Sequence, residues 1–207
     1  MSFPAMGTVY GTLMNFRGEL QALGPKMNEA PYKAPPKAPV LYIKPSNTWT
    51  MNDVPIMLPA RAPEVEVGAT VGMVMKAPGE VAGYVLMNDL SVPHESFFRP
   101  PVKYKCIDGF LAVGDTLLPA GGDVDPKDFV LDVIVNGGLK QTVNFADLVR
   151  PAHQLLDEVS EFMTLGAGDV LMLGCDWGRP RVRPFDRVEI KADRLGSLAN
   201  IMVPETS

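Results

Sequence analysis

The sequence FVLDVIVNGGLKQTV, residues 129–143, predicts two antiparallel strands joined by a tight turn. Residues 129–135 are rich in the β-branched and aromatic side chains that favour strands. Asn136-Gly137 follows them, and Asn-Gly between two apolar runs is the strongest short-range signal for a hairpin, because both residues tolerate the positive φ of the turn. Residues 139–143 form the return strand. This hairpin predicts a fold that is rich in β-structure.

Short apolar runs of the same kind recur along the chain. We expect further strands at residues 40–43, 67–75, 81–87, 110–113, 169–173, 186–191 and 198–203, and a short strand leading into a loop or helix at 11–16. One helix stands out after Pro151, where Ala152, Leu155 and Val159 follow the spacing of a single buried face, with Gly166 as its end. Many short strands against one clear helix favour a mainly β fold, a sandwich or roll, over a parallel α/β sheet.

The composition is that of a loop-rich globular chain. The 207 residues include 20 Pro and 19 Gly, and four of the prolines fall within residues 31–39. Proline fixes φ and has no backbone donor, so residues 31–39 are expected to form an extended connector rather than a paired strand. We expect a single domain over residues 1–207, with residues 1–39 as N-terminal segment and connector and residues 40–203 as the β core.

Charge and composition exclude several functional classes. The net charge of −5 gives no basic footprint for nucleic acid. No apolar run approaches the roughly 20 residues that span a bilayer, and the first residues lack the basic start and apolar run of a signal peptide. We therefore expect a cytoplasmic protein without nucleic-acid or membrane partners. Two Cys and two His are too few for a disulfide framework or a multi-His zinc site, so any metal must be bound by oxygen.

The densest polar cluster lies between residues 88 and 110. Asp89 ends an apolar run, and Arg99, Lys105 and Asp108 follow within 20 residues. This grouping suits an anionic substrate held near a cation, and the alternative interpretation is a solvated loop with ion pairs. Glycine motifs for phosphate or dinucleotide binding are absent from the sequence, as is a nucleophile elbow.

An ordered set of short motifs resembles the fumarylacetoacetate hydrolase family. The motifs are Lys44-Pro45-Ser46-Asn47-Thr48, Gly83-Tyr84 with Asn88-Asp89, Phe98-Arg99-Pro100, Lys105 with Asp108-Gly109, and residues 160–165 with Gly168-Asp169. Together the motifs span roughly residues 8 to 203. The resemblance implies a mixed β-sandwich roll with few helices, in agreement with the strand pattern.

Two segments resemble one branch of that family more specifically. They are residues 31–37 and residues 95–100. They resemble the enzymes that isomerise 2-hydroxyhepta-2,4-diene-1,7-dioate and decarboxylate 5-oxopent-3-ene-1,2,5-tricarboxylate during 4-hydroxyphenylacetate (homoprotocatechuate) breakdown. The chain resembles the first of the two homologous halves of those enzymes. The resemblance implies a small dicarboxylate or tricarboxylate substrate, and a homodimer or a hetero-oligomer with a homologous subunit.

The resemblance also implies a divalent metal, Mg²⁺ or Mn²⁺, that acts as a Lewis acid on a keto acid. Its ligands in the family are a Glu-x-Glu pair on one strand, where residues i and i+2 face the same side, and a later Asp. Asp89 matches the later Asp, but Gly68 and Thr70 stand at the two glutamate positions. An alternative register places Glu64 and Glu66 with Asp89. It remains open whether the chain binds a metal or none.

Further positions follow from the same motifs. The general-base pair His-x-x-Glu of the family is replaced by Glu19 and Ala22. Lys105 is the candidate catalytic residue. The candidate substrate-binding residues, which could meet substrate carboxylates or line the pocket, are Arg99, Lys44, Asn47 and Asp108.

Three functional hypotheses result. In the first, the chain is a subunit or half of the isomerase/decarboxylase type of enzyme. In the second, it is a catalytically degenerate structural or carboxylate-binding partner of a metal-competent homologous subunit. In the third, it is an independent metal-dependent hydrolase or decarboxylase of keto acids. The missing glutamates motivate the second hypothesis. The third requires Glu64, Glu66 and Asp89 to meet at one ion.

Overall fold

The computed structural model describes residues 7–94 and 101–205, and it confirms a mainly β fold with few helices. The strands form three sheets: β2-β1-β11-β6-β7-β8-β3, β10-β9-β13-β14-β4, and the small pair β12-β5. Their bounds are β1 Val9–Leu13, β2 Val40–Lys44, β3 Trp49–Met51, β4 Ile56–Leu58, β5 Val65–Glu66, β6 Ala69–Ala77, β7 Glu80–Asp89, β8 Leu111–Pro119, β9 Val130–Val135, β10 Gly138–Asn144, β11 Val170–Met172, β12 Arg181–Val182, β13 Arg187–Ala192 and β14 Gly196–Pro204.

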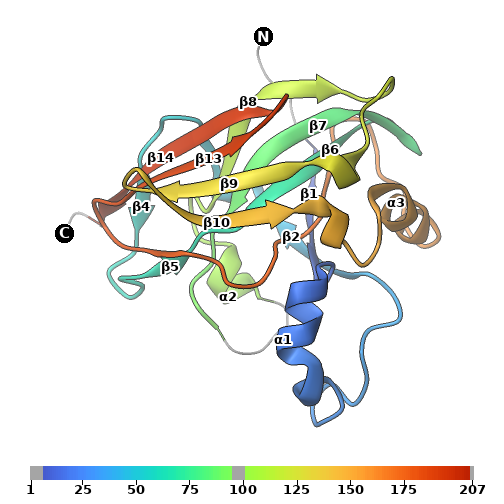
Figure 1. Cartoon of the computed structure of the whole chain (residues 1–207), viewed down its shortest axis with the longest axis horizontal. Coiled ribbons are helices and arrows are strands. Elements are labelled where there is room, and N and C mark those ends of the chain that lie inside the picture. Colours follow the sequence, from blue (N-terminus) through green and yellow to red (C-terminus); the bar gives the residue numbers. More distant parts are fainter. Residues whose placement is uncertain (1–6, 95–100, 206–207) are drawn as a thin grey trace.

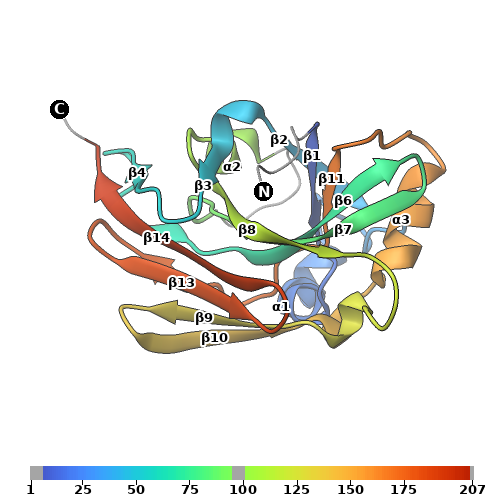
Figure 2. The ribbon, with the colours of Figure 1, turned by 90° about the horizontal axis from the view of Figure 1, so that it is seen from above.

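The two larger sheets are mixed and lie one over the other, as Figure 2 shows. Most neighbours are antiparallel, but β1 and β11, β3 and β8, and β4 and β14 run parallel. Such pairs join segments far apart in the sequence, because parallel neighbours cannot be linked by a tight turn. Parallel pairing thereby places segments that are distant in the sequence side by side in both larger sheets.

The predicted hairpin at residues 129–143 is confirmed as β9 and β10. Asn136 and Gly137 adopt φ of 50° and 80°, as the tight turn requires. The register shifts between Leu139 and Gln141, which is a bulge that the sequence pattern did not predict. The other predicted strands are also present, with bounds that differ by a few residues at their ends.

The described part of the chain has three α-helices, α1 (Arg17–Met27), α2 (Val102–Lys105) and α3 (Ala152–Ser160). Helix α3 is the predicted one and buries Leu155, Leu156 and Val159. It ends earlier than expected, and Phe162 is 61% exposed instead of continuing the buried face. Residues 11–16 lead into helix α1, as expected from the sequence. This helix extends away from the sheets in Figure 1. Within residues 7–94 and 101–205, no helix has the length and apolar character needed to cross a bilayer.

The central strands β6 and β7 are buried on both faces. Met73, Met75 and Leu86 belong to the main core between the two larger sheets. Val74 and Val85 belong to a second apolar cluster, which includes residues of β1, β2 and α1. Because successive residues of a strand point to opposite faces, β6 and β7 contribute to both clusters. Their continuous apolar runs follow from this burial, and Asp89 at the end of β7 is correspondingly enclosed.

Candidate functional site

A buried carboxylate, Asp89, lies at the centre of the candidate site. It is the last residue of β7, and its side chain has no exposure to solvent. Lys44 Nζ, at the end of β2, lies 2.9 Å from its Oδ1, and Lys105 Nζ, at the end of α2, lies 2.5 Å from its Oδ2. The hydroxyl of Tyr42 donates a hydrogen bond to Asp89 Oδ2. We call these four residues, Asp89, Lys44, Lys105 and Tyr42, the Asp89 cluster.

The Asp89 cluster is held by the backbone around it. Lys44 Nζ also donates to the carbonyl oxygens of Lys105 at 2.5 Å, Phe110 at 2.8 Å and Leu90 at 3.4 Å, so its three protons are directed at backbone acceptors. This side chain therefore joins β2 to both ends of the segment between α2 and β8. Lys44 and Lys105 are each 1% exposed, so both ammonium groups are enclosed with their carboxylate.

Charge and burial act in opposite directions on the Asp89 cluster. Burial alone would raise the pKa of Asp89, but the ammonium groups of Lys105 and Lys44 outweigh it and hold that pKa well below its ordinary value. Burial lowers the pKa of Lys44, and the carboxylate of Asp89 opposes that shift. Burial and the neighbouring carboxylate together raise the pKa of Tyr42, which keeps the phenol protonated as a donor. Asp89 is thus an anion that the protein itself neutralises.

A second buried ion pair lies beside the cluster. Glu19 of α1 accepts a hydrogen bond from Arg179 Nη2 at 2.6 Å, and its other oxygen accepts one from the Met14 backbone N–H at 2.7 Å. Burial raises the pKa of Glu19, partly offset by Arg179. Burial disfavours the charge on Arg179, but Glu19 outweighs it and the pKa of Arg179 is raised. This pair ties α1 to the loop between β11 and β12.

The positions that the resemblance assigns to metal-binding glutamates offer no carboxylate. A Cβ added to Gly68 would lie 2.2 Å from the Asp89 backbone oxygen, so the packed backbone leaves no room for a side chain there. Thr70 Oγ1 donates to the Gly174 carbonyl at 2.6 Å. Among residues 7–94 and 101–205, no three His, Cys, Asp or Glu side chains form a group that could hold a metal ion. The described residues therefore do not fit a divalent metal at Asp89.

Glu64 and Glu66, the ligands of the alternative register, are paired with arginines near β12. Glu64 lies 3.2 Å from Arg181 Nη1 and 2.9 Å from Arg183 Nη2. Glu66, in β5, lies 3.8 Å from both Arg179 Nη1 and Arg181 Nε. These carboxylates sit at the β5–β12 pair, and the described part of the chain does not bring them together with Asp89 as a metal site.

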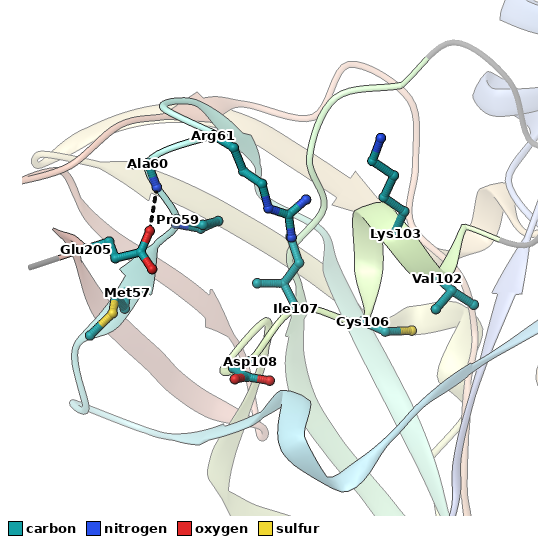
Figure 3. A pocket seen from close by; sticks show the side chains of 10 residues that line it. All are labelled: Met57, Pro59, Ala60, Arg61, Val102, Lys103, Cys106, Ile107, Asp108 and Glu205. Atoms are coloured by element: carbon teal, nitrogen blue, oxygen red, sulfur yellow. Dashed lines mark hydrogen bonds between the residues drawn. The ribbon is translucent and has the colours of Figure 1, made fainter. Parts of the chain in front are cut away.

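The predicted substrate-binding residues are dispersed. Lys44 belongs to the buried Asp89 cluster, whereas Asn47 donates to Asp108 Oδ1 at 2.6 Å on the exposed surface. Asp108 lines a cavity of about 670 Å³ between the β4–β5 connection and α2, into which Arg61 also projects (Figure 3). Arg99 lies outside the described residues. Of the three that the structure describes, Asn47 and Asp108 are the pair that meet directly.

A second cavity, of about 560 Å³, opens beside the Glu19–Arg179 pair. It is lined by residues of α1, β5, the segment after β7, the β11–β12 connection and β12, namely Ala22, Leu23, Lys26, Glu66, Pro93, His94, Trp177, Gly178, Arg179 and Arg181. We call it the Arg179 cavity. Because Arg179 of the buried Glu19–Arg179 pair lines it, this cavity is the candidate binding site.

Sequence reasoning did not identify Arg179, Tyr42 or Cys175 as members of this region. Cys175 Sγ lies 3.9 Å from Asp89 Oδ2, and burial raises the pKa of its thiol to about 12, so it is a neutral neighbour of the carboxylate. Tyr42 and Arg179 reach the site from β2 and from the loop before β12, contacts that no local pattern reveals.

Comparison with known proteins agrees with this architecture. The family model described as fumarylacetoacetate (FAA) hydrolase C-terminal matches residues 8–203. The 4-hydroxyphenylacetate degradation bifunctional isomerase/decarboxylase of Salmonella dublin is 41% identical over 209 residues, covering 96% of this chain and 48% of that protein. The homoprotocatechuate catabolism bifunctional isomerase/decarboxylase of Escherichia coli is 38% identical with the same coverage. The chain spans about half the length of these curated relatives.

Solved structures share the fold. The 5-carboxymethyl-2-hydroxymuconate delta-isomerase of Mycobacterium smegmatis superposes with a TM-score of 0.82 at 25% identity, over 98% of this chain and 81% of that one. The fumarylpyruvate hydrolase of Pseudomonas aeruginosa, solved in complex with Mn²⁺ and pyruvate, superposes with a TM-score of 0.82 at 19% identity, over 97% of this chain and 91% of that one. On the strength of the family match over residues 8–203, the chain belongs to the fumarylacetoacetate hydrolase family.

Proposed function

We propose that this chain is one half of a two-part isomerase/decarboxylase of 4-hydroxyphenylacetate breakdown. The reactions are the isomerisation of 2-hydroxyhepta-2,4-diene-1,7-dioate and the decarboxylation of 5-oxopent-3-ene-1,2,5-tricarboxylate. The observation that carries this proposal is the identity of 41% across 96% of the chain to a curated enzyme of that name, of which the chain spans only 48%. A homologous domain, in the same polypeptide or in a separate one, supplies the remainder.

A second candidate is a partner whose own site has lost metal chemistry. The observation that favours it is the Asp89 cluster, in which two lysines neutralise the only retained carboxylate of the expected ligand set. In this arrangement the chain stabilises or completes a homologous domain that holds the metal. Its own residues then keep Asp89 charged and buried, position α1 through Glu19, and offer cations around the Arg179 cavity.

The experiment that tests the first candidate is a reconstitution. The chain, a homologous domain with a complete Glu-x-Glu and Asp ligand set, and their mixture are each assayed with both diacid and triacid intermediates. We expect turnover by the mixture that exceeds the sum of the separate activities. Failure of every combination to turn over either intermediate contradicts the assignment to this pathway.

Variants in the mixture separate the two candidates. Lys105→Met removes one cation from the Asp89 cluster, and Lys127→Met serves as the control, because Lys127 forms an exposed ion pair with Asp125. If this chain contributes chemistry, Lys105→Met lowers kcat while the folded fraction and the assembly persist. If this chain acts as a partner only, kcat depends on the metal ligands of the other domain. Lys105→Met then changes kcat no more than Lys127→Met does.

A further inference from the structure

The space around Asp89 is filled by protein cations where the family resemblance places a divalent ion. Lys44 and Lys105 lie 2.9 Å and 2.5 Å from the two carboxylate oxygens, so an ammonium group stands beside each oxygen, and within the described chain only Oδ2 accepts hydrogen bonds. Neither lysine is more than 1% exposed. A metal could reach Asp89 only by displacing at least one of these groups, and the described residues offer it no further carboxylate there.

At hydrogen-bonding distance the buried charges of this region do not balance. Lys44, Lys105 and Arg179 are three cations, and Asp89 and Glu19 are the two carboxylates that pair with them at 2.5–2.9 Å. The nearest further carboxylate is Glu66, 3.8 Å from Arg179 Nη1, so the third positive charge is balanced only at longer range and beside the Arg179 cavity. An uncompensated buried charge is unfavourable, and an anion close to it lowers that cost.

The Arg179 cavity is where an anion can approach. Arg179 uses Nη2 for Glu19 and Nε for the Asp176 carbonyl at 3.3 Å. Its Nη1 lies 3.8 Å from Glu66 Oε2, which is beyond hydrogen-bonding distance. Arg181 Nε lies equally far from Glu66 Oε1. Arg179 Nη1 and Arg181 Nε therefore form ion pairs with Glu66 but donate no hydrogen bond to it.

The walls of the cavity suit an organic ligand. Leu23, Pro93 and Trp177 contribute apolar surface, and Trp177 is 54% exposed. Lys26, Arg179 and Arg181 are the lining cations and Glu66 is the lining carboxylate, while Glu19 and Glu64 pair with Arg179 and Arg181 from outside the cavity. Binding sites for small molecules combine apolar walls with a few placed polar groups, and arginine binds carboxylates through two parallel hydrogen bonds.

We propose that the Arg179 cavity binds an organic carboxylate through Arg179 and Arg181 without a divalent metal, and that the buried cations of the chain replace the metal's positive charge. The inference takes its ligand class from the proposed function, but it concerns binding by this chain alone. It differs from the metal-chelate arrangement that the family resemblance implies, because the groups that meet the ligand are guanidinium groups of the β11–β12 connection and β12.

Calorimetric titration of the full chain with succinate in excess EDTA tests the proposal. We expect saturable binding of succinate and none of the uncharged succinamide. Arg181→Gln should weaken binding roughly ten-fold, the usual effect of losing one charge-assisted hydrogen bond. Arg183→Gln is the matched control, since Arg183 is 73% exposed, pairs with Glu64 and does not line the cavity.

A second variant addresses Arg179 without leaving a lone buried charge. The double substitution Glu19→Gln with Arg179→Gln removes both members of the ion pair, and we expect it to weaken succinate binding at least as much as Arg181→Gln. Three results overturn the proposal: no binding of succinate by the folded chain in EDTA, binding that requires Mn²⁺, or equal weakening by Arg181→Gln and Arg183→Gln.

The proposal and the proposed function can fail separately. If the reconstituted assembly is active but the isolated chain binds no succinate in EDTA, the metal-free site is refuted and the pathway assignment stands. If succinate binds as predicted but no combination of domains turns over the pathway intermediates, the carboxylate site stands and the pathway assignment is refuted.

Discussion

At the scale of single residues, the stability of the region depends on Asp89 keeping both of its lysines. Lys105→Met leaves Asp89 with one ammonium partner in a water-free environment. Breaking a buried ion pair typically costs about 3–5 kcal/mol, and we expect a value near the lower end because Lys44 remains. Urea unfolding measures the loss. Lys127→Met, in the exposed pair with Asp125, should leave the free energy of unfolding essentially unchanged.

Two outcomes bear on that prediction. If Lys105 acts through Asp89, the double variant Asp89→Asn with Lys105→Met should be less destabilised than the sum of the two single variants. Equal urea midpoints for Lys105→Met and Lys127→Met would contradict the central role of this lysine.

The ionisation of Asp89 should make the stability of the protein depend on pH. The lysines hold the pKa of Asp89 below its ordinary value of 3.8, so the native state keeps this group charged at pH values where the unfolded chain has taken up a proton. The stabilisation is therefore complete above about pH 4 and is lost as pH falls towards the native pKa. We expect the free energy of unfolding to fall more steeply between pH 4 and pH 2 in the wild type than in Asp89→Asn. The raised pKa of Glu19 changes stability with pH in the opposite direction. Glu19 is present in both proteins, so its contribution cancels when the wild type is compared with Asp89→Asn.

The sequence allowed some of these residues to be predicted and not others. Asp89, Lys44 and Lys105 each lie in a short motif whose order along the chain carried the family resemblance, and the missing glutamates at Gly68 and Thr70 could be read directly. Arg179 could not be predicted, because its significance comes from a contact with Glu19 across 160 positions of sequence. A charged residue in a loop is ordinarily solvated, and only the three-dimensional structure shows that this one is buried.

At the scale of elements, the Glu19–Arg179 pair connects helix α1 to the β11–β12 connection. Glu19→Gln would leave the guanidinium of Arg179, whose side chain is 7% exposed, without its closest carboxylate. We expect a loss of roughly 3 kcal/mol in the free energy of unfolding. We also expect faster amide hydrogen exchange in α1, because the helix loses its buried connection to the loop.

The surface pair Lys76–Glu80 provides the control for this prediction. Its side chains are 70% and 62% exposed at the β6–β7 turn, and such pairs contribute little. Glu80→Gln should leave both the unfolding midpoint and the exchange in α1 unchanged. Exchange in α1 that is as slow in Glu19→Gln as in the wild type would show that apolar packing of Leu23 and Met27 fixes the helix without the ion pair.

The elements themselves were predictable where local chemistry agrees with the fold. The hairpin at Asn136-Gly137 and the face of α3 both carry strong local signals, and both are present. Helix α1 contains Gly18, Gly24 and Pro25, which are poor helix formers, so its formation depends on tertiary contacts such as that of Glu19. The short strands β3, β4, β5 and β12 have two or three residues each, too few for a periodic pattern to show.

At the scale of the whole molecule, the replacement of a metal by lysines predicts how the fold responds to metal ions. A ligand that binds only the native state raises its stability by RT ln(1 + [L]/Kd), about 2.7 kcal/mol at one hundred times Kd. The described residues offer Mn²⁺ no group of three ligands, and Asp89 is already neutralised. Thermal unfolding of the chain should therefore shift by no more than roughly 1 °C between excess Mn²⁺ and excess EDTA.

The fumarylpyruvate hydrolase of Pseudomonas aeruginosa, solved with Mn²⁺, provides a control of the same fold in this comparison, and its midpoint should rise with the metal. A Mn²⁺-dependent rise of several degrees in the present chain would mean that the native state holds ligands for the ion, and it would contradict the assignment of Lys44 and Lys105 as its substitutes. Because a whole-molecule midpoint records binding anywhere in the native chain, the measurement also covers the residues that the structure does not describe.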